Sequence, residues 1–113
     1  MEIIINMWGK DRSLKFVRRT YLCNGNLSIE VMNYDEEYEF WEPWCSLTVN
    51  LDLILESNRA FLDTNNCSRE IIEWLFKNRY VTKIGERRSG FCVYPLVEFS
   101  EEFMETIVAE EDE

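Results

Sequence analysis

Five carboxylates and five aromatic rings share eleven consecutive positions, YDEEYEFWEPW, at residues 34–44. Carboxylates bind arginine and lysine side chains through charge-assisted hydrogen bonds, and one arginine can bond both oxygens of a carboxylate, much as it bonds phosphate. Aromatic side chains are common anchors of protein interfaces. The segment therefore predicts a surface that imitates phosphates and binds a basic protein. The predicted partner-binding residues are Asp35, Glu36, Glu37, Glu39, Trp41 and Glu42.

Other interpretations of this segment are open at the level of sequence. Paired carboxylates serve glycosidases, but neighbours in one loop do not place two carboxyl groups across a substrate. The order of acids differs from that of an EF-hand loop, although weak calcium binding by an acidic cluster is a remaining alternative. The simplest alternative is a solvated acidic loop, with Phe40, Trp41 and Trp44 belonging to the core.

The rest of the chain offers little catalytic chemistry. It has no histidine, the commonest general base and metal ligand, and no glycine-rich phosphate loop. Its four cysteines, at residues 23, 45, 67 and 92, lack the close pairs of zinc or thiol-exchange sites. We interpret them as small buried hydrophobes, with a metal site of four thiolates as the alternative. The sequence predicts a protein that is not an enzyme and uses no cofactor or metal.

The net charge of −10 comes from two segments. Residues 34–56 and residues 100–113 each hold seven acidic and no basic groups, whereas the remainder of the chain is mildly basic. Phosphates dominate the affinity of proteins for nucleic acids, so these segments would repel DNA and RNA, and we expect no direct nucleic-acid partner. The amino terminus lacks the pattern of a signal peptide or a membrane span. We therefore expect a cytoplasmic protein that does not contact a membrane.

Alternating apolar residues predict several strands that must position the acidic segment. The expected strands cover residues 2–8, 13–22, 27–34 and 44–51, and Asn24-Gly25 predicts a hairpin between the second and third. The acidic segment then links two strands. Residues 60–64 are expected to form a short edge strand, and residues 80–84 and 91–99 a closing hairpin around a turn at 85–90, with Pro95 marking an edge or bulge.

One main helix is expected within residues 65–80, with Ser68 as its N-cap. Its apolar face would consist of Ile71, Ile72, Leu75 and Phe76, and Glu73 would pair with Lys77 on the other side. The predicted class is α+β: an antiparallel β-sheet with one main α-helix packed on it and a possible short C-terminal helix. Residues 1–99 would form a single domain. Residues 100–113 would form an acidic tail, partly helical or disordered, with Ser100 as an N-cap and an apolar stripe over residues 103–108.

Five pieces of the sequence occur in an order that is similar to a known family. They are Trp8-Gly9, NGNLSI, EPWCSLTVNL, AFLDTNN and SGFCVYPL. Over roughly residues 8–99 the chain resembles the domain of unknown function family 4313, and LTVNL and DTNN are the most specific pieces. The acidic segment lies inside this span without matching, and the tail lies beyond it. The resemblance implies a small protein carried by phages and mobile elements of Gram-positive gut bacteria, and it carries over no catalytic residue.

Small acidic proteins of such elements include inhibitors of host defence, among them anti-CRISPR and anti-restriction proteins. We therefore expect a non-catalytic acidic DNA mimic in the cytoplasm of the bacterial host. It would block nucleic-acid access to a basic, nucleic-acid-handling defence protein, with an RNA-guided CRISPR nuclease as the favoured target. The alternative is an accessory or structural interaction module of the element, which would use a sheet edge or the apolar stripe of the tail and have no inhibitory role.

Overall fold

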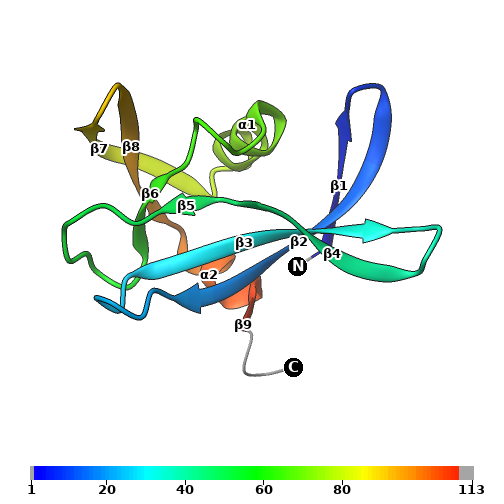
Figure 1. The fold of residues 1–113 in the computed structure, drawn as a ribbon, viewed down its shortest axis with the longest axis horizontal. Helices are drawn as coiled ribbons and strands as arrows, with labels where there is room; N and C mark the ends of the chain where they lie inside the picture. Colours follow the sequence, from blue (N-terminus) through cyan, green and yellow to red (C-terminus); the bar gives the residue numbers. More distant parts are fainter. Residues whose placement is uncertain (1, 110–113) are drawn as a thin grey trace.

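Two mostly antiparallel sheets and two short helices make up the computed structural model, which describes residues 2–109 (Figure 1). The first sheet has the order β1 (Glu2–Met7), β2 (Lys10–Thr20), β3 (Leu27–Asp35) and β4 (Phe40–Ser46), with β9 (Val108–Ala109) parallel to β2. The second has the order β5 (Thr48–Val49), β6 (Arg59–Leu62), β8 (Cys92–Phe99) and β7 (Val81–Ser89). The helices are α1 (Arg69–Lys77) and α2 (Glu101–Thr106). Within these residues, neither helix has the length and apolar character that crossing a membrane requires.

The chain passes from the first sheet to the second at Leu47, where a single strand was predicted. The Leu47 N–H donates to the carbonyl of Ile29 in β3, whereas its carbonyl accepts from the N–H of Asp63, just after β6. The Leu47 side chain is fully buried. Because the Leu47 backbone hydrogen-bonds to both sheets, the predicted strand 44–51 divides into β4 and β5. The structure therefore has two sheets where one was predicted.

The Asn24-Gly25 hairpin is confirmed, although its loop is longer than two residues. The Tyr21 N–H donates to the Asn26 carbonyl (2.9 Å), and the Gly25 N–H donates to the Tyr21 carbonyl (2.8 Å). Gly25 has a φ of 73°, which glycine adopts without steric cost. The buried Asn26 side chain donates to the Leu53 carbonyl and accepts from the Leu55 N–H, so this turn also fixes the loop after β5.

The predicted helix is present as α1, but its apolar face is narrower than expected. Ile71 and Leu75 are buried, whereas Phe76 is exposed. Ser68 occupies the N-cap position without making a side-chain cap bond. Glu73 pairs with Arg69 at 2.7 Å instead of with Lys77, and this exposed pair contributes little to stability.

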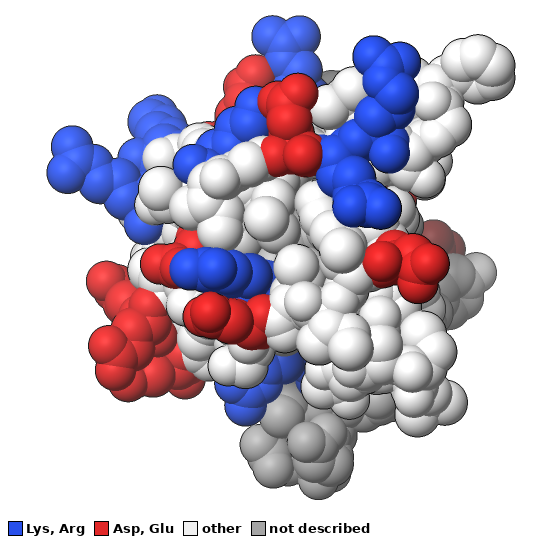
Figure 2. All heavy atoms as spheres, turned by 90° about the vertical axis from the view of Figure 1, so that its left-hand side faces the viewer, with Lys and Arg blue, Asp and Glu red and all other residues white. Residues whose placement is uncertain are grey.

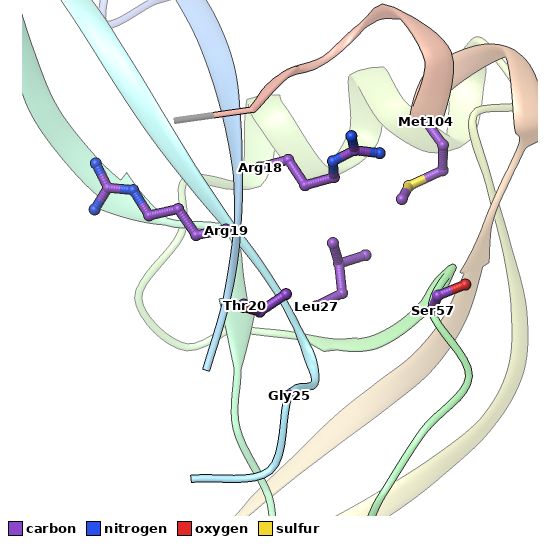
Figure 3. A pocket seen from close by; sticks show the side chains of 7 residues that line it. All are labelled: Arg18, Arg19, Thr20, Gly25, Leu27, Ser57 and Met104. Atoms are coloured by element: carbon purple, nitrogen blue, oxygen red, sulfur yellow. The ribbon is translucent and has the colours of Figure 1, made fainter. Parts of the chain in front are cut away.

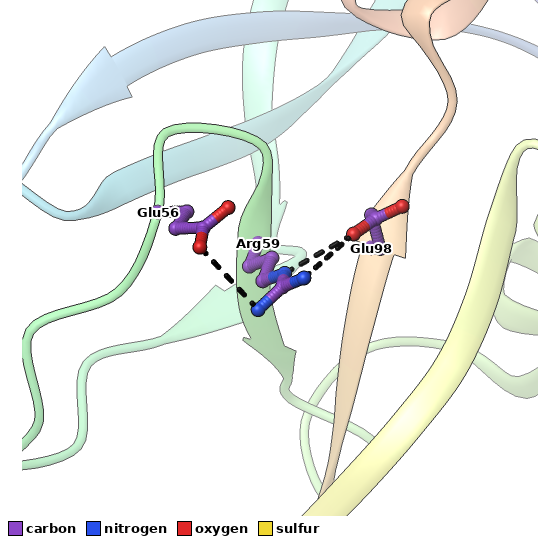
Figure 4. Close-up of polar contacts among 3 residues, drawn as sticks. All are labelled: Glu56, Arg59 and Glu98. Atoms are coloured by element: carbon purple, nitrogen blue, oxygen red, sulfur yellow. Dashed lines mark hydrogen bonds and ion pairs between the residues drawn. The ribbon is translucent and has the colours of Figure 1, made fainter.

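The second sheet differs from its prediction in two ways. Residues 59–62 form an internal strand and not an edge, because β6 pairs with β5 on one side and β8 on the other. The strand β7 continues to Ser89, so the turn contains only Gly90 and Phe91, and Gly85 lies at a bulge in the strand. Arg59 joins this sheet to the preceding loop, bonding Glu98 at 3.1 Å and Glu56 at 3.7 Å (Figure 4).

An aromatic cluster joins the two sheets through Phe103 of α2. Its ring centroid lies 5.3 Å from that of Phe16 in β2, 5.3 Å from that of Phe99 in β8, and 5.4 Å from that of Tyr80 before β7. Trp74 of α1 completes the cluster by contacting Phe16 and Tyr80. One side chain of α2 therefore contacts both sheets.

The predicted acidic tail begins as α2, and Ser100 is its N-cap as expected, accepting from the Phe103 N–H at 3.1 Å. Phe103 and Ile107 are buried in the core, so the core extends beyond the predicted domain boundary at residue 99. The final four acidic residues, 110–113, lie outside the described residues.

Replacing Phe103 by alanine should lower the free energy of unfolding by about 3–5 kcal/mol, because the cavity would open where both sheets meet. Urea denaturation followed by circular dichroism measures this loss. The matched control is Phe91→Ala, which truncates a fully exposed ring and should change the free energy by less than about 0.5 kcal/mol. Equal losses in the two variants would contradict the central position of Phe103.

Candidate partner-binding site

The acidic segment forms the tip of the hairpin between β3 and β4. Strand β3 ends at Asp35 and β4 begins at Phe40, so most of the predicted linker belongs to the two strands and the turn contains residues 36–39. Tyr34 pairs with Trp41 and Asp35 with Phe40 in the register of the sheet. The carboxylates therefore lie on a tight turn and not along an extended chain.

Asp35 holds the turn together. One oxygen of its side chain accepts from the N–H groups of Glu37 (2.9 Å) and Tyr38 (3.1 Å), and its carbonyl accepts from the N–H of Glu39 (2.8 Å). Glu39 has a φ of 57°, a left-handed conformation that such turns require. The role that the structure gives Asp35 is to fix the backbone that presents its neighbours.

Three of the six predicted residues, Glu36, Glu37 and Glu39, are exposed at the tip. In the part of the chain that the structure describes, none of these three carboxylates forms an ion pair within 4.0 Å. Glu42 lies further back on β4, half-buried, and accepts a hydrogen bond from the Asn33 side chain at 3.2 Å. The tip thus presents a local excess of negative charge to solvent.

Trp41 lies on a face of the first sheet, behind the tip. Its ring is 5.2 Å from the Tyr34 ring, edge to face, and the Lys15 ammonium lies 4.8 Å from its centroid. These contacts leave Trp41 half-buried, whereas Tyr38 is 70% exposed and Phe40 48% exposed. The rings that stand free beside the carboxylates are therefore Tyr38 and Phe40. Sequence reasoning missed them because it chose an anchor by residue type and not by position in the register.

A hollow of about 250 Å³ separates the acidic turn from the β1–β2 hairpin. Asp35, Glu36, Glu37 and Glu42 line one part of it, and Lys10 and Arg12 line another. The Arg12 guanidinium contacts the rings of Trp8 and Trp44, at 5.6 and 4.8 Å from their centroids. Asn33 also lines the hollow, and only 5% of its surface is exposed. Its side-chain oxygen has no hydrogen-bond partner among the described residues.

Two free thiols meet between β4 and the segment before α1, although their spacing in the sequence showed no pair. The sulfurs of Cys45 in β4 and Cys67 before α1 lie 3.4 Å apart. The contact between the two sulfurs lowers the pKa of the Cys45 thiol, and the same contact together with burial raises the pKa of the Cys67 thiol. The expectation of four buried cysteines holds only for Cys67, because Cys45 and Cys92 are half-buried and Cys23 is exposed.

A second hollow, of about 260 Å³, lies between the β2–β3 hairpin and α2 (Figure 3). Arg18 extends into it toward Met104, whereas Arg19 points away from it (Figure 3). Leu27 and Ser57 complete much of the lining. Only one of the two arginine side chains extends into the hollow, so the two guanidinium groups do not bind one anion there together (Figure 3).

The β7–β8 hairpin carries positive charge at the other end of the molecule. Lys83, Arg87 and Arg88 are exposed on β7, and Phe91 at the turn is 103% exposed. Figure 2 shows Lys and Arg side chains gathered over the upper part of the face that contains this hairpin, and Figure 1 shows the β3–β4 turn on the opposite side. Exposed cations of β7 thus lie far from the exposed carboxylates of the β3–β4 turn, although Lys10 and Arg12 lie beside that turn and Lys83 pairs with Glu86 at 2.8 Å.

A sequence model of one protein family, described as a domain of unknown function (DUF4313), matches residues 15–111. The match includes α2 and β9, which the resemblance seen in the sequence had left out, and omits β1. No curated protein and no solved structure matches the chain.

Replacing Asp35 by alanine should loosen the turn, because two N–H groups lose their acceptor, and should cost about 1 kcal/mol of stability. Amide hydrogen exchange at Glu37 and Tyr38, followed by NMR, should become faster. Asp35→Asn retains an acceptor oxygen while removing the charge, and should keep exchange slow. Equal acceleration in both variants would mean that the charge, and not the hydrogen bonds, fixes the turn.

Proposed function

The chain belongs to the DUF4313 family, and on that premise we propose that it is a non-catalytic acidic protein that binds and blocks a basic, nucleic-acid-handling protein of host defence. The observation that carries this proposal is the β3–β4 turn. Its three free carboxylates stand on a backbone that Asp35 holds in one conformation. A fixed turn loses little conformational freedom on binding, so more of the interaction energy is retained as affinity.

The charges and the rings of the turn have different effects on binding. Exposed carboxylates raise the rate at which a basic partner is encountered, and they bond arginine and lysine at the positions where the partner expects phosphates. Tyr38 and Phe40 add apolar contact area beside those charges. Such contact slows dissociation, because buried aromatic anchors dominate the energetics of many interfaces.

The hollow behind the turn offers acceptors to one hydrogen-bond donor side chain of the partner, beside Lys10 and Arg12 of its own lining. Glu42 and the unpartnered oxygen of Asn33 are hydrogen-bond acceptors in its lining, and Asp35 adds a third. A guanidinium with five N–H donors can use several acceptors at once. Binding there would satisfy the buried Asn33 oxygen, which otherwise costs free energy.

An RNA-guided CRISPR nuclease is the proposed target, and a phage or another mobile element is the proposed source. Such nucleases hold nucleic acid in a positively charged channel and recognise it mainly through its backbone. A compact acidic hairpin fits that chemistry without needing to reproduce base edges. The protein would then act as a DNA mimic that occupies the channel and excludes the nucleic-acid substrate of the nuclease.

The alternative, an accessory interaction module, is favoured by a different part of the surface. The tail stripe is not available to it, because Phe103 and Ile107 are buried in the core. The β7–β8 hairpin instead exposes Ile84, Phe91 and Val93 next to an outer strand of the second sheet. A partner of this hairpin would not depend on the acidic turn.

The triple variant Glu36→Gln, Glu37→Gln and Glu39→Gln should lose at least about tenfold in affinity for the target, because three charged contacts become neutral. The immobilised wild type first captures proteins from a bacterial lysate that contains CRISPR nucleases, and inhibition of DNA cleavage is then measured with the purified nuclease.

The matched control removes the same charge from α2, through Glu101→Gln, Glu102→Gln and Glu105→Gln, which are also exposed. Retained inhibition by this control, with loss in the turn variant, would support the proposal. Retained inhibition in both variants, or loss of capture only in Arg87→Gln/Arg88→Gln, would overturn it in favour of the alternative.

A further inference from the structure

The two thiols of Cys45 and Cys67 are placed for chemistry that neither could perform alone. Their sulfurs are in contact at 3.4 Å, although 21 residues separate them in the chain. Cys45 is fixed by its place in β4, opposite Val31, and Cys67 by an N–H bond to the Asp63 carbonyl at 2.8 Å. Both are free thiols in the described chain.

Cys45 is also accessible to a small molecule. It lines a surface hollow of about 270 Å³ together with Trp8, Trp44, Asn66 and Ser68. Cys67 is absent from this lining and is 5% exposed. The geometry therefore distinguishes an outer thiol that a reagent reaches first from an inner thiol directly behind it.

The surroundings of Cys45 favour its thiolate, which is the reactive form of cysteine. The contact with the Cys67 thiol, at 3.4 Å, lowers the pKa of the Cys45 thiol. Burial of Cys45 and the charges of Glu30 and Asp63 oppose ionisation, and the contact with Cys67 outweighs each of them.

We propose that Cys45 and Cys67 form a redox site in which hydrogen peroxide oxidises Cys45 and Cys67 then closes a disulfide. In the first step the Cys45 thiolate attacks one peroxide oxygen, the O–O bond breaks, and hydroxide leaves with a proton as water. In the second step the Cys67 sulfur attacks the sulfenic sulfur, the S–O bond breaks, and hydroxide leaves with the Cys67 proton as a second water. The two thiols lose two electrons, and the peroxide gains them.

The disulfide would have a structural consequence because its two ends belong to different parts of the fold. Cys45 lies in the first sheet, and Cys67 lies in the segment that leads from β6 of the second sheet to α1. Oxidation would thus close a covalent link across the two sheets, beside the Leu47 connection. A closed loop of this length restricts the unfolded chain and stabilises the folded one.

The test exposes the full-length protein to hydrogen peroxide and maps the products by mass spectrometry without reduction. The expected product is a peptide pair joined through Cys45 and Cys67. Cys45 should be oxidised at least about tenfold faster than the more exposed Cys23, because the contact with Cys67 favours the reactive thiolate of Cys45. Cys67→Ser should leave a Cys45 sulfenic acid that dimedone traps, whereas Cys23→Ser and Cys92→Ser should leave the joined pair unchanged.

Two results would overturn the proposal. One is oxidation of Cys23 at the same rate as Cys45 or faster, which would mean that the contact with Cys67 gives no reactivity. The other is conversion of Cys45 to a sulfinic acid in the wild type without any link to Cys67, which would mean that the inner thiol does not reach the oxidised sulfur. The circular dichroism spectra of the serine variants establish that each remains folded before the comparison is made.

Discussion

The contact of Phe103 with both sheets is the constraint on which the remaining structure depends. Phe16 and Phe99 belong to different sheets and meet through this one ring, while Tyr80 and Trp74 connect the same cluster to β7 and α1. Residues 2–109 contain only short helices, so no long helix of this part covers either sheet. The cluster therefore supplies the apolar contacts that hold two small, twisted sheets against each other.

The buried core extends from this cluster through both sheets to α1, and the hairpin ends that lie beyond it are free to carry charge. The β3–β4 turn places three carboxylates in solvent at one end of the molecule. The β7–β8 hairpin places cations and the fully exposed Phe91 at the other end. The exposed cations of β7 and the exposed carboxylates of the β3–β4 turn both lie in solvent, where water screens them and no cost of burial arises. The proposed recognition of a basic partner uses this division, since steering depends on charge that is local and unpaired.

The sequence predicted the parts of the fold that local patterns determine. Asn24-Gly25 and the alternating residues after it specify a hairpin, and Ser100 specifies the start of α2. Long-range pairing was not predictable in the same way. Nothing local shows that Leu47 bonds both sheets, that Trp41 pairs with Tyr34 behind the tip, or that Cys45 meets Cys67. The local composition of the segment indicated the carboxylates of the candidate site. The strand register was needed to show that Tyr38 and Phe40, and not Trp41, are the rings exposed beside them.

The central claim is that free carboxylates of the β3–β4 turn bind a basic protein in place of phosphates. The most direct test is the dissociation constant of the purified complex with the captured nuclease, measured by titration calorimetry over a tenfold range of sodium chloride concentration. The proposed mechanism predicts that affinity falls steeply as salt rises, and that the fall is shallower for the variant with glutamine at positions 36, 37 and 39. An affinity that stays constant across the range, with the same value in both proteins, would contradict it.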